Sequence, residues 1–227
     1  MTRVLEFDSR AAVAGSVKSL VVLVHGYGAD GADLLGLADP LGTHLPHTAF
    51  VAPNAPERCS GNPFGYQWFP IPWLDGSSEA AAEAGLMQAA DDLNAFLDAQ
   101  LAHYALPPEA LALIGFSQGS MISLHIAPRR AAPLAGVVAF SGRLLMPERL
   151  QAEACVFPPI LLAHGDQDPV VPFEDMAKAG QALSDSGFET FGHVMRGTGH
   201  GIAPDGLSAA LQFLHARLPD AENMPDA

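Results

Sequence analysis

Residues 111–120 read LALIGFSQGS, an apolar run followed by a glycine, a serine and a second glycine. The run has the pattern of a buried strand, and the SMISLHIA stretch from Ser120 onwards has that of a helix. Gly115, Ser117 and Gly119 fit the G-x-S-x-G spacing of a tight strand-to-helix turn, in which small neighbours leave the serine hydroxyl free. The alternative is that Ser117 only caps the helix. The strand and helix context favours a nucleophilic serine.

Similar apolar runs recur along the chain and alternate with helix-like stretches. Strands are expected at 19–26, 48–54, 111–116, 135–142, 158–165 and 190–195, and VLEF at 4–7 is a candidate antiparallel edge strand. Helices are expected near 31–42, 78–104, 118–130, 173–186 and 205–218. Near-continuous apolar strands are buried on both faces, which favours a parallel sheet. The prediction is an α/β fold with a mostly parallel central sheet and helices on both faces.

The segment 53–78 is rich in proline and glycine, which predicts a long loop without regular elements. A loop of this length in a compact domain is usually functional. After it, Ser77 or Ser78 can cap a helix that Glu79 favours in its first turn, and this helix should be the longest. We predict one domain over 1–219, with 53–78 as its substrate-pocket loop and a disordered tail at 220–227.

Charge and composition limit the partners of the 227-residue chain. A net charge of −14 with only 11 lysine and arginine residues argues against nucleic acid and anionic membranes. The N-terminus lacks a signal-peptide core and no window of about 18 uncharged apolar residues occurs, so we expect no stable membrane insertion and a cytoplasmic location. Cys59 and Cys155 have no metal-like spacing and are expected to be free thiols in a reducing compartment.

A nucleophilic serine needs a base, and the base needs a carboxylate that orients it. His200 is the one histidine of nine in a glycine-flanked loop between the last expected strand and the last helix. Asp166 and Asp168 both follow the strand at 158–165. Asp166 is placed to bond turn amides, whereas Asp168, just before Pro169, is free to reach the histidine and is favoured. His164 is expected to brace this turn.

Five of the other histidines have ordinary positions. Three lie in helical patterns and two in loops, and all are expected to be packing or surface residues: His103, His125, His215, His44 and His47.

With these residues in place, the chain resembles the phospholipase/carboxylesterase group of α/β-hydrolases, which includes acyl-protein thioesterases and small bacterial carboxylesterases. The matching motifs, in order, are LVHGYGADGADL (23–34), PNAP (53–56), QWFP (67–70), GFSQGSM (115–121), FSGRL (140–144), HGDQDPVVP (164–172) and GTGHGI (197–202). The resemblance implies an α/β-hydrolase fold and a triad of Ser117, Asp168 and His200. It also implies an oxyanion hole formed by the backbone N–H groups of Tyr27 and Gln118, with His25 in a structural role.

Two features differ from the acyl-protein thioesterases and indicate the bacterial carboxylesterase branch. The stretch FGYQWFPIPWLDG (64–76) is richer in aromatic and proline residues, and FSGRLL replaces a cysteine-containing strand end. Apolar side chains near the serine are candidates for binding substrate: Phe64, Trp68, Phe69, Ile71, Trp73, Leu144, Leu145 and Val170. The alternative is that the aromatic residues pin the loop to the domain or form a dimer contact.

The predicted function is a serine carboxylesterase that hydrolyses small-molecule esters with short to medium acyl chains through an acyl-enzyme. This mechanism needs no metal and no cofactor. The same triad would serve a lysophospholipase, an acyl-protein thioesterase or a peptidase, and the non-enzymatic alternative is a hydrolase-like binding protein that has lost its chemistry. The physiological substrate and the oligomeric state, for which a homodimer is one option, stay open.

Overall fold

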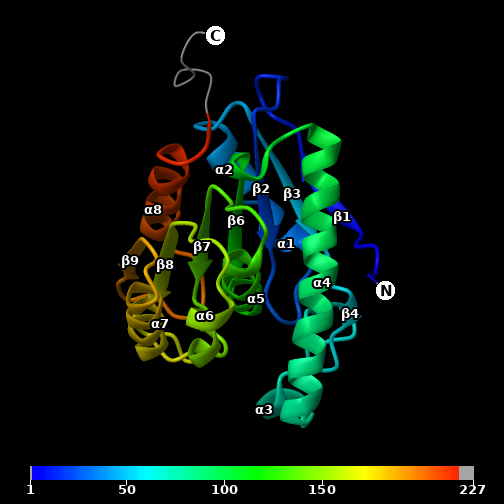
Figure 1. Ribbon diagram of the computed structural model, residues 1–227, viewed down its shortest axis with the longest axis vertical. Coiled ribbons are helices and arrows are strands. Elements are labelled where there is room, and N and C mark those ends of the chain that lie inside the picture. Colours follow the sequence, from blue (N-terminus) through cyan, green and yellow to red (C-terminus); the bar gives the residue numbers. More distant parts are fainter. Residues whose placement is uncertain (1, 220–227) are drawn as a thin grey trace.

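The computed structural model describes residues 2–219, so the expected tail at 220–227 lies outside it. Its centre is a seven-stranded sheet with the order β1-β3-β2-β6-β7-β8-β9 (Figure 1). The strands are β1 (Phe7–Arg10), β2 (Ser19–Val24), β3 (Thr48–Pro53), β6 (Leu111–Phe116), β7 (Gly136–Phe140), β8 (Ile160–Gly165) and β9 (Thr190–Met195). Only β1 runs antiparallel to its neighbour within this sheet. The mostly parallel sheet is confirmed.

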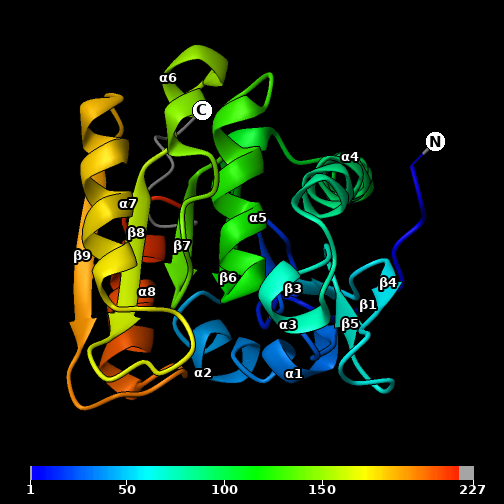
Figure 2. The ribbon, with the colours of Figure 1, turned by 90° about the horizontal axis from the view of Figure 1, so that it is seen from below.

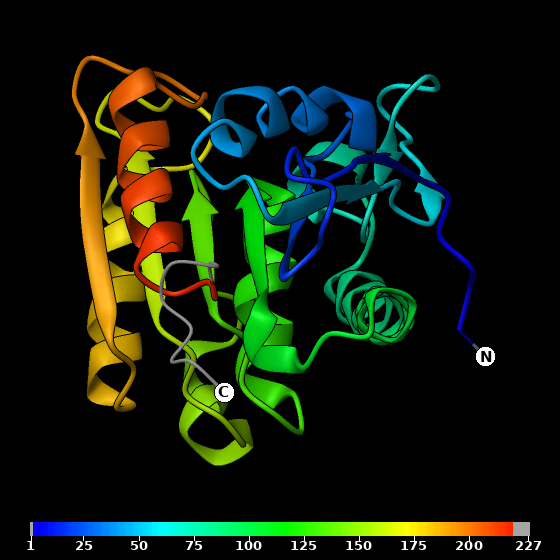
Figure 3. The same ribbon diagram turned by 90° about the horizontal axis from the view of Figure 1, so that it is seen from above.

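Helices cover both faces of the sheet (Figures 2 and 3). One face carries α1 (Gly31–Leu35), α2 (Ala38–Gly42) and α8 (Pro204–His215), and the other carries α4 (Glu79–Tyr104), α5 (Gln118–Ile126), α6 (Pro147–Glu153) and α7 (Glu174–Asp185). Successive side chains of a strand point to opposite faces, so β2 sends Val22 and Val24 into the core under α4 and α5 and Val21 and Leu23 into the other core. Burial on both sides explains the continuous apolar sequence of the central strands.

The helix α4 begins where the sequence indicates. The Ser78 side chain accepts a hydrogen bond from the Ala81 N–H at 3.1 Å, and Glu79 lies in the first turn. Its 26 residues make it the longest helix among the described residues, as expected. The first turns of α4 and the short α3 (Pro72–Asp75) extend beyond the carboxyl ends of the parallel strands (Figure 1). They therefore lie at the edge of the sheet where the predicted catalytic residues emerge.

The predictions for the two edge strands need correction. The antiparallel edge strand is Phe7–Arg10 instead of 4–7, with Phe7 opposite Pro53. The Glu6 oxygen still accepts from the Asn54 N–H at 2.8 Å, whereas Arg3 donates from its backbone N and from Nε to the two carboxylate oxygens of Asp92 on α4, each at 2.7 Å. At the opposite edge, β9 is largely exposed and not buried on both faces, and among the residues that the structure describes it pairs only with β8.

The segment 53–78 contains regular structure that the sequence analysis missed. β4 (Glu57–Arg58) pairs with β5 (Tyr66–Gln67), and α3 follows them. Pro72 occupies the first turn of α3, where a proline costs no hydrogen bond, and Gly76 ends the helix with φ 72°. Proline and glycine content therefore limits these elements to a few residues without excluding them.

Smaller differences have similar causes. The helix expected near 31–42 is divided into α1 and α2, and the one expected to reach residue 130 ends at Ile126, where Pro128 follows in a 3₁₀ turn (η2, Ala127–Arg129). The helix α6 and the 3₁₀ turn η1 (Pro108–Ala110) were not expected, and both start at a proline.

The described residues contain no helix both long and apolar enough to cross a membrane. Cys59 is buried and Cys155 is exposed, and both are free thiols, as predicted.

The buried His125 of α5 gives stability a dependence on pH. Its side chain is 2% exposed, and burial, together with the positive charge of Arg129, lowers its pKa from 6.5 to about 4. Between these values the unfolded chain binds the proton and the folded chain does not, so stability falls as the pH drops. We expect a loss of about 2 kcal/mol in unfolding free energy between pH 7.5 and pH 5, measured by urea titration.

The His125→Leu variant should lose most of this pH dependence. His103→Gln, on an exposed position of α4, is the control and should keep it. An unchanged pH dependence in His125→Leu would show that other groups are responsible.

Candidate active site

Ser117 stands at the turn between β6 and α5 in a strained backbone conformation. Its φ is 53° and its ψ is −115°, which costs a residue other than glycine about 1–3 kcal/mol. A Cβ atom at position 115 would lie 2.5 Å from the Ser120 nitrogen, and one at position 119 only 1.8 Å from the Val24 oxygen. Both glycines are therefore required for α5 to pack against the sheet. The Ser117 side chain makes no capping hydrogen bond, so the helix-cap alternative is wrong.

His200 and Asp168 form a hydrogen-bonded pair. Nδ1 of His200 lies 2.7 Å from Oδ2 of Asp168, and the Asp168 side chain is fully buried while that of His200 is 17% exposed. The other carboxylate oxygen, Oδ1, accepts from the N–H groups of Val170 at 2.8 Å and Val171 at 2.9 Å. Both oxygens are thus occupied, and the carboxylate is fixed in one orientation.

The protonation state of this pair follows from its surroundings. Burial by itself raises the pKa of Asp168, but the hydrogen bonds from His200, Val171 and Val170 outweigh burial and hold the pKa below its ordinary value. Asp168 is therefore ionised at neutral pH and can only accept. Nδ1 of His200 must then carry the proton, which leaves Nε2 of the neutral ring as an acceptor.

Asp166 has a different partner. Its Oδ1 accepts from the Gly197 N–H at 2.7 Å, and the neighbouring Gln167 N–H donates to the Thr198 oxygen at 3.0 Å. These bonds tie the loop after β8 to the loop that carries His200. His164 lies below the same loop, with Nε2 3.0 Å from the Val171 oxygen. Of the two aspartates, only Asp168 is hydrogen-bonded to His200.

Ser117, Asp168 and His200 follow the carboxyl ends of β6, β8 and β9, which lie at one edge of the sheet (Figure 1). The His200 ring packs against Phe116, the residue before Ser117, with 4.8 Å between ring centroids. Ser117 is 8% exposed. The parallel topology thus brings three distant parts of the sequence to one end of the sheet, with the His200 ring against the residue that precedes Ser117.

The predicted oxyanion donors also adjoin Ser117. A Cβ atom at position 26 would lie 3.3 Å from the Ser117 Cβ, so the Gly26–Tyr27 peptide is beside the serine, and Gln118 follows it directly. Within residues 2–219, the backbone N–H groups of Tyr27 and Gln118 have no protein acceptor. An oxyanion hole requires unpaired N–H donors next to the nucleophile, and these two N–H groups supply them.

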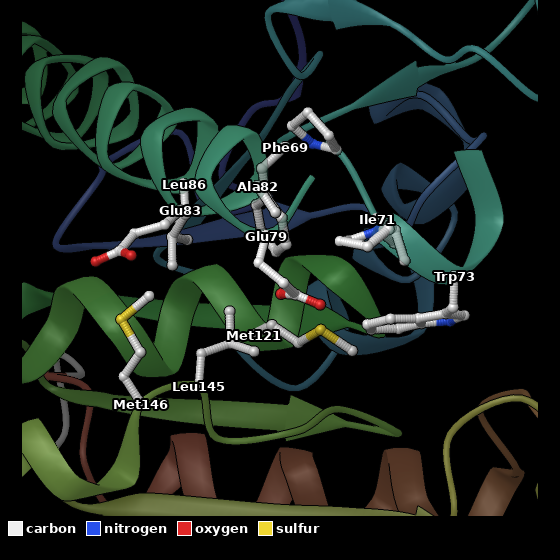
Figure 4. A pocket seen from close by; sticks show the side chains of 12 residues that line it. Phe69, Ile71, Trp73, Glu79, Ala82, Glu83, Leu86, Met121, Leu145 and Met146 are labelled. Atoms are coloured by element: carbon white, nitrogen blue, oxygen red, sulfur yellow. The ribbon is translucent and has the colours of Figure 1, made fainter. Parts of the chain in front are cut away.

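A small cavity of about 240 Å³ lies between α3, α4, α5 and the segment after β7. Figure 4 shows Ala82 and Leu86 of α4 facing Met121 and Leu145 across it, with Trp73 at one end. The Met121 N–H donates to the Ser117 oxygen at 3.1 Å, so the cavity begins one helical turn from the serine, and neither Ser117 nor His200 lines it. The predicted residues that line it are Phe69, Ile71, Trp73 and Leu145.

Four predicted substrate-binding residues do not line this cavity. Trp68 is wrong for this role because its side chain is 0% exposed and packs in the core. Phe64 is 87% exposed and borders a separate hollow beside Gly28. Leu144 is buried in the core. Val170 is exposed on the loop that carries Asp168, and its N–H donates to the Asp168 carboxylate. Their order along the chain suggested proximity, but their side chains point elsewhere.

The cavity residues contributed by helices were not among those predicted, apart from Trp73. These are Glu79, Ala82, Glu83, Leu86 and Met121, with Met146 from the start of α6. Their spacing held a signal, since residues three and four apart share one helical face and Met121 lies four positions after Ser117. For α5, the helical face that lines the cavity could have been predicted from the position of Ser117. For α4, the face that lines the cavity depends on how the preceding loop folds.

A parallel sheet with helices on both faces, a strained serine after a central strand, and an aspartate and a histidine after later strands define the α/β-hydrolase class. A sequence model described as Phospholipase/Carboxylesterase matches residues 11–218. The chain belongs to this family, and it is a hydrolase with the α/β-hydrolase fold.

The relatives of this chain include acyl-protein thioesterases and an esterase. Acyl-protein thioesterase 1 of Mycosarcoma maydis is 31% identical over 86% of this chain and 90% of its own length. The crystal structure of esterase PE8 covers 95% of this chain and 100% of its own, with 45% identity and a TM-score of 0.90. Acyl-protein thioesterase 2 of Zea mays matches with 25% identity and a TM-score of 0.75 over 94% of this chain and 99% of its own.

Proposed function

We propose that the protein is a serine carboxylesterase that hydrolyses neutral esters with short to medium acyl chains. The observation that carries the proposal is the apolar cavity that begins one helical turn from Ser117. Its volume of about 240 Å³ lies below the roughly 300–1,000 Å³ of sites that take drug-sized ligands, so it suits a short chain. The 45% identity to an esterase supports the reaction type.

Each site residue has a separate role in the proposed reaction. Nε2 of His200 takes the proton of the Ser117 hydroxyl, and Oγ attacks the ester carbonyl carbon. The N–H groups of Tyr27 and Gln118 bind the resulting oxyanion, and His200 passes its proton to the departing alcohol. Water, deprotonated by His200, then attacks the acyl-enzyme and releases the acid. Asp168 stabilises the imidazolium through the 2.7 Å hydrogen bond.

The charged residues that line the cavity are both carboxylates. Glu79 lies between Trp73 and Ala82, and Glu83 points away from Trp73 (Figure 4) and pairs with Arg149 at 2.8 Å. An anionic substrate would meet Glu79 without a compensating cation in the cavity wall. We therefore propose small neutral esters as substrates. Separately, from the net charge and the N-terminal sequence, we propose a cytoplasmic location with no nucleic-acid partner and no stable membrane insertion.

A thioesterase is the second candidate, because two curated relatives with this name are 30–31% identical over most of this chain. The family description also includes phospholipases, which keeps a lysophospholipase as an alternative, whereas none of the relatives compared above is named a peptidase. The carboxylesterase cleaves an oxygen ester, whereas the thioesterase cleaves a thioester. Matched pairs of substrates in which only the bridging oxygen is replaced by sulfur separate them, and a higher kcat/KM for the oxyester at equal chain length is expected.

The cavity predicts a limit on chain length. Each additional methylene in contact with apolar walls gains about 0.8 kcal/mol, so kcat/KM for p-nitrophenyl esters should rise about fourfold per carbon and then stop rising. In Leu86→Ala, the limit should move to longer chains by about two carbons while acetate hydrolysis changes little. Rates from C2 to C16, with p-nitrophenyl hemisuccinate as the anionic comparison, test this.

Leu93→Ala is the matched control, since Leu93 is a buried leucine of α4 that does not line the cavity. It should lower stability without moving the limit. A preference for C16 in the wild type, or an equal fall for every chain length in Leu86→Ala, would contradict the assignment of the cavity.

A further inference from the structure

The fully buried Trp68 is bonded to both sides of the proposed oxyanion hole. Its indole Nε1 donates to the His25 oxygen at 2.9 Å, and its backbone N donates to Oε1 of Gln118 at 2.9 Å. Nε2 of the same Gln118 side chain donates to the Phe69 oxygen at 2.7 Å. Three hydrogen bonds thus join the end of β2 to the start of α5 through the dipeptide Trp68–Phe69.

On the β2 side, these contacts extend to the peptide that carries the Tyr27 N–H. The Ala55 N–H donates to Nε2 of His25 at 2.9 Å, so Nδ1 carries the proton of the neutral ring and donates to the Gly26 oxygen at 2.7 Å. Burial lowers the pKa of His25, which keeps the ring neutral. The Gly26 carbonyl and the Tyr27 N–H belong to one planar peptide, so a bond to the former fixes the direction of the latter.

On the α5 side, the Gln118 side chain is 0% exposed and both of its polar atoms are bonded to the dipeptide. The backbone N–H of the same residue is the second proposed donor. A shift of Trp68 would therefore move both donors relative to each other.

We propose that the Trp68 indole and the Gln118 side chain are positioning residues that set the spacing and direction of the two oxyanion donors. They never touch substrate. The inference rests on the proposed function, and it adds a structural link between the chain-binding cavity and the oxyanion hole, because Phe69 belongs to both the dipeptide and the cavity wall (Figure 4).

The physical basis is the steep dependence of oxyanion stabilisation on geometry. The donors act on charge that develops only in the transition state, so a small displacement weakens transition-state binding and leaves the ground state nearly unaffected. Substitution of a residue that only fills the core would lower stability, and it would not weaken transition-state binding more than substrate binding. The two roles therefore predict different kinetics.

Trp68→Phe and Gln118→Met test the proposal. The first removes the indole donor to His25, the second removes both the Gln118 donor and its acceptor, and each leaves an apolar side chain in the core. We expect kcat for p-nitrophenyl butyrate to fall about ten- to hundredfold with KM changed less than threefold. The affinity for a trifluoromethyl ketone, which mimics the tetrahedral intermediate, should fall by the same factor as kcat/KM. The double variant should lose little more than the worse single variant, because both changes release one connected structure.

Two controls separate positioning from stability. Gln100→Met removes another buried glutamine side chain, on α4, and Leu101→Ala destabilises the far end of that helix. Both should lower the melting temperature and keep kcat and the ketone affinity.

The possible failures are distinguishable. If the wild type hydrolyses p-nitrophenyl butyrate and the Trp68 and Gln118 variants keep its kcat and ketone affinity, the positioning role is wrong and the esterase stands. If the fall in kcat of the double variant equals the product of the two single falls, the two side chains act independently, which also overturns the proposal. A wild type without hydrolysis of any neutral ester would overturn the proposed function itself.

Discussion

Ser117→Ala is expected to lower kcat for p-nitrophenyl butyrate by about 10⁵–10⁶, the largest effect of any single change in this chain. The alanine lacks the oxygen that forms the acyl-enzyme, and His200 then has no hydroxyl to activate. The initial burst of p-nitrophenol that accompanies acylation should also disappear. Stopped-flow and steady-state measurements on the same preparation test both.

The matched control is Ser123→Ala. Ser123 is a buried serine of the same helix, and its hydroxyl donates to the Gly119 oxygen at 2.7 Å. It should retain kcat within a fewfold of the wild type. A burst that persists in Ser117→Ala would mean that another residue is acylated.

Asp168→Asn is expected to lower kcat by about 10⁴, as for other triad carboxylates. An amide at position 168 no longer stabilises the imidazolium, and it can hold His200 in the wrong tautomer by donating to Nδ1. KM should change little, since Asp168 is buried away from the cavity. Steady-state kinetics at pH 7.5, together with circular dichroism to confirm the fold, measure the effect.

Asp166→Asn provides the contrast, because this side chain bonds the Gly197 N–H instead of His200. An asparagine oxygen can still accept that bond, but without the negative charge the bond is weaker, so a lower melting temperature is expected. The value of kcat should fall less than tenfold, because the bond between His200 and Asp168 is retained. Loss of activity in Asp166→Asn at an unchanged melting temperature, with Asp168→Asn active, would reverse the assignment.

The parts of the site predicted from sequence are those that the order of strands determines. Ser117, Asp168 and His200 each follow a parallel strand, and the carboxyl ends of such strands meet at one edge whatever the loops between them do. The reason given for preferring Asp168 to Asp166 was wrong: Asp168 accepts from the turn amides of Val170 and Val171 as well as bonding His200, whereas Asp166 accepts from the Gly197 N–H, 31 positions away. The order of the strands could be predicted from the sequence, but the partners of the two carboxylates could not.

The cavity could not be predicted in this way. Trp68 and Trp73 are five positions apart in one aromatic stretch, yet the first is fully buried and the second is 62% exposed. The difference comes from contacts distant in sequence, with His25 and Gln118 fixing Trp68. Composition marks the segment as apolar, but only the folded chain decides which aromatic ring enters the core.

The edge of the sheet shows a similar limit. VLEF has the alternation of a strand, but the strand begins at Phe7, and Arg3 is bonded to Asp92, 89 positions away. A buried aspartate in a long helix gives no sign in the sequence of which cation it pairs with.

Covalent labelling tests the central claim most directly. The wild type treated with a fluorophosphonate should gain one label per chain, and mass spectrometry of its peptides should place that label on Ser117. Asp168→Asn should be labelled far more slowly and Ser117→Ala not at all. A label on a different residue, or undiminished labelling of Ser117→Ala, would contradict the assignment of Ser117 as the nucleophile.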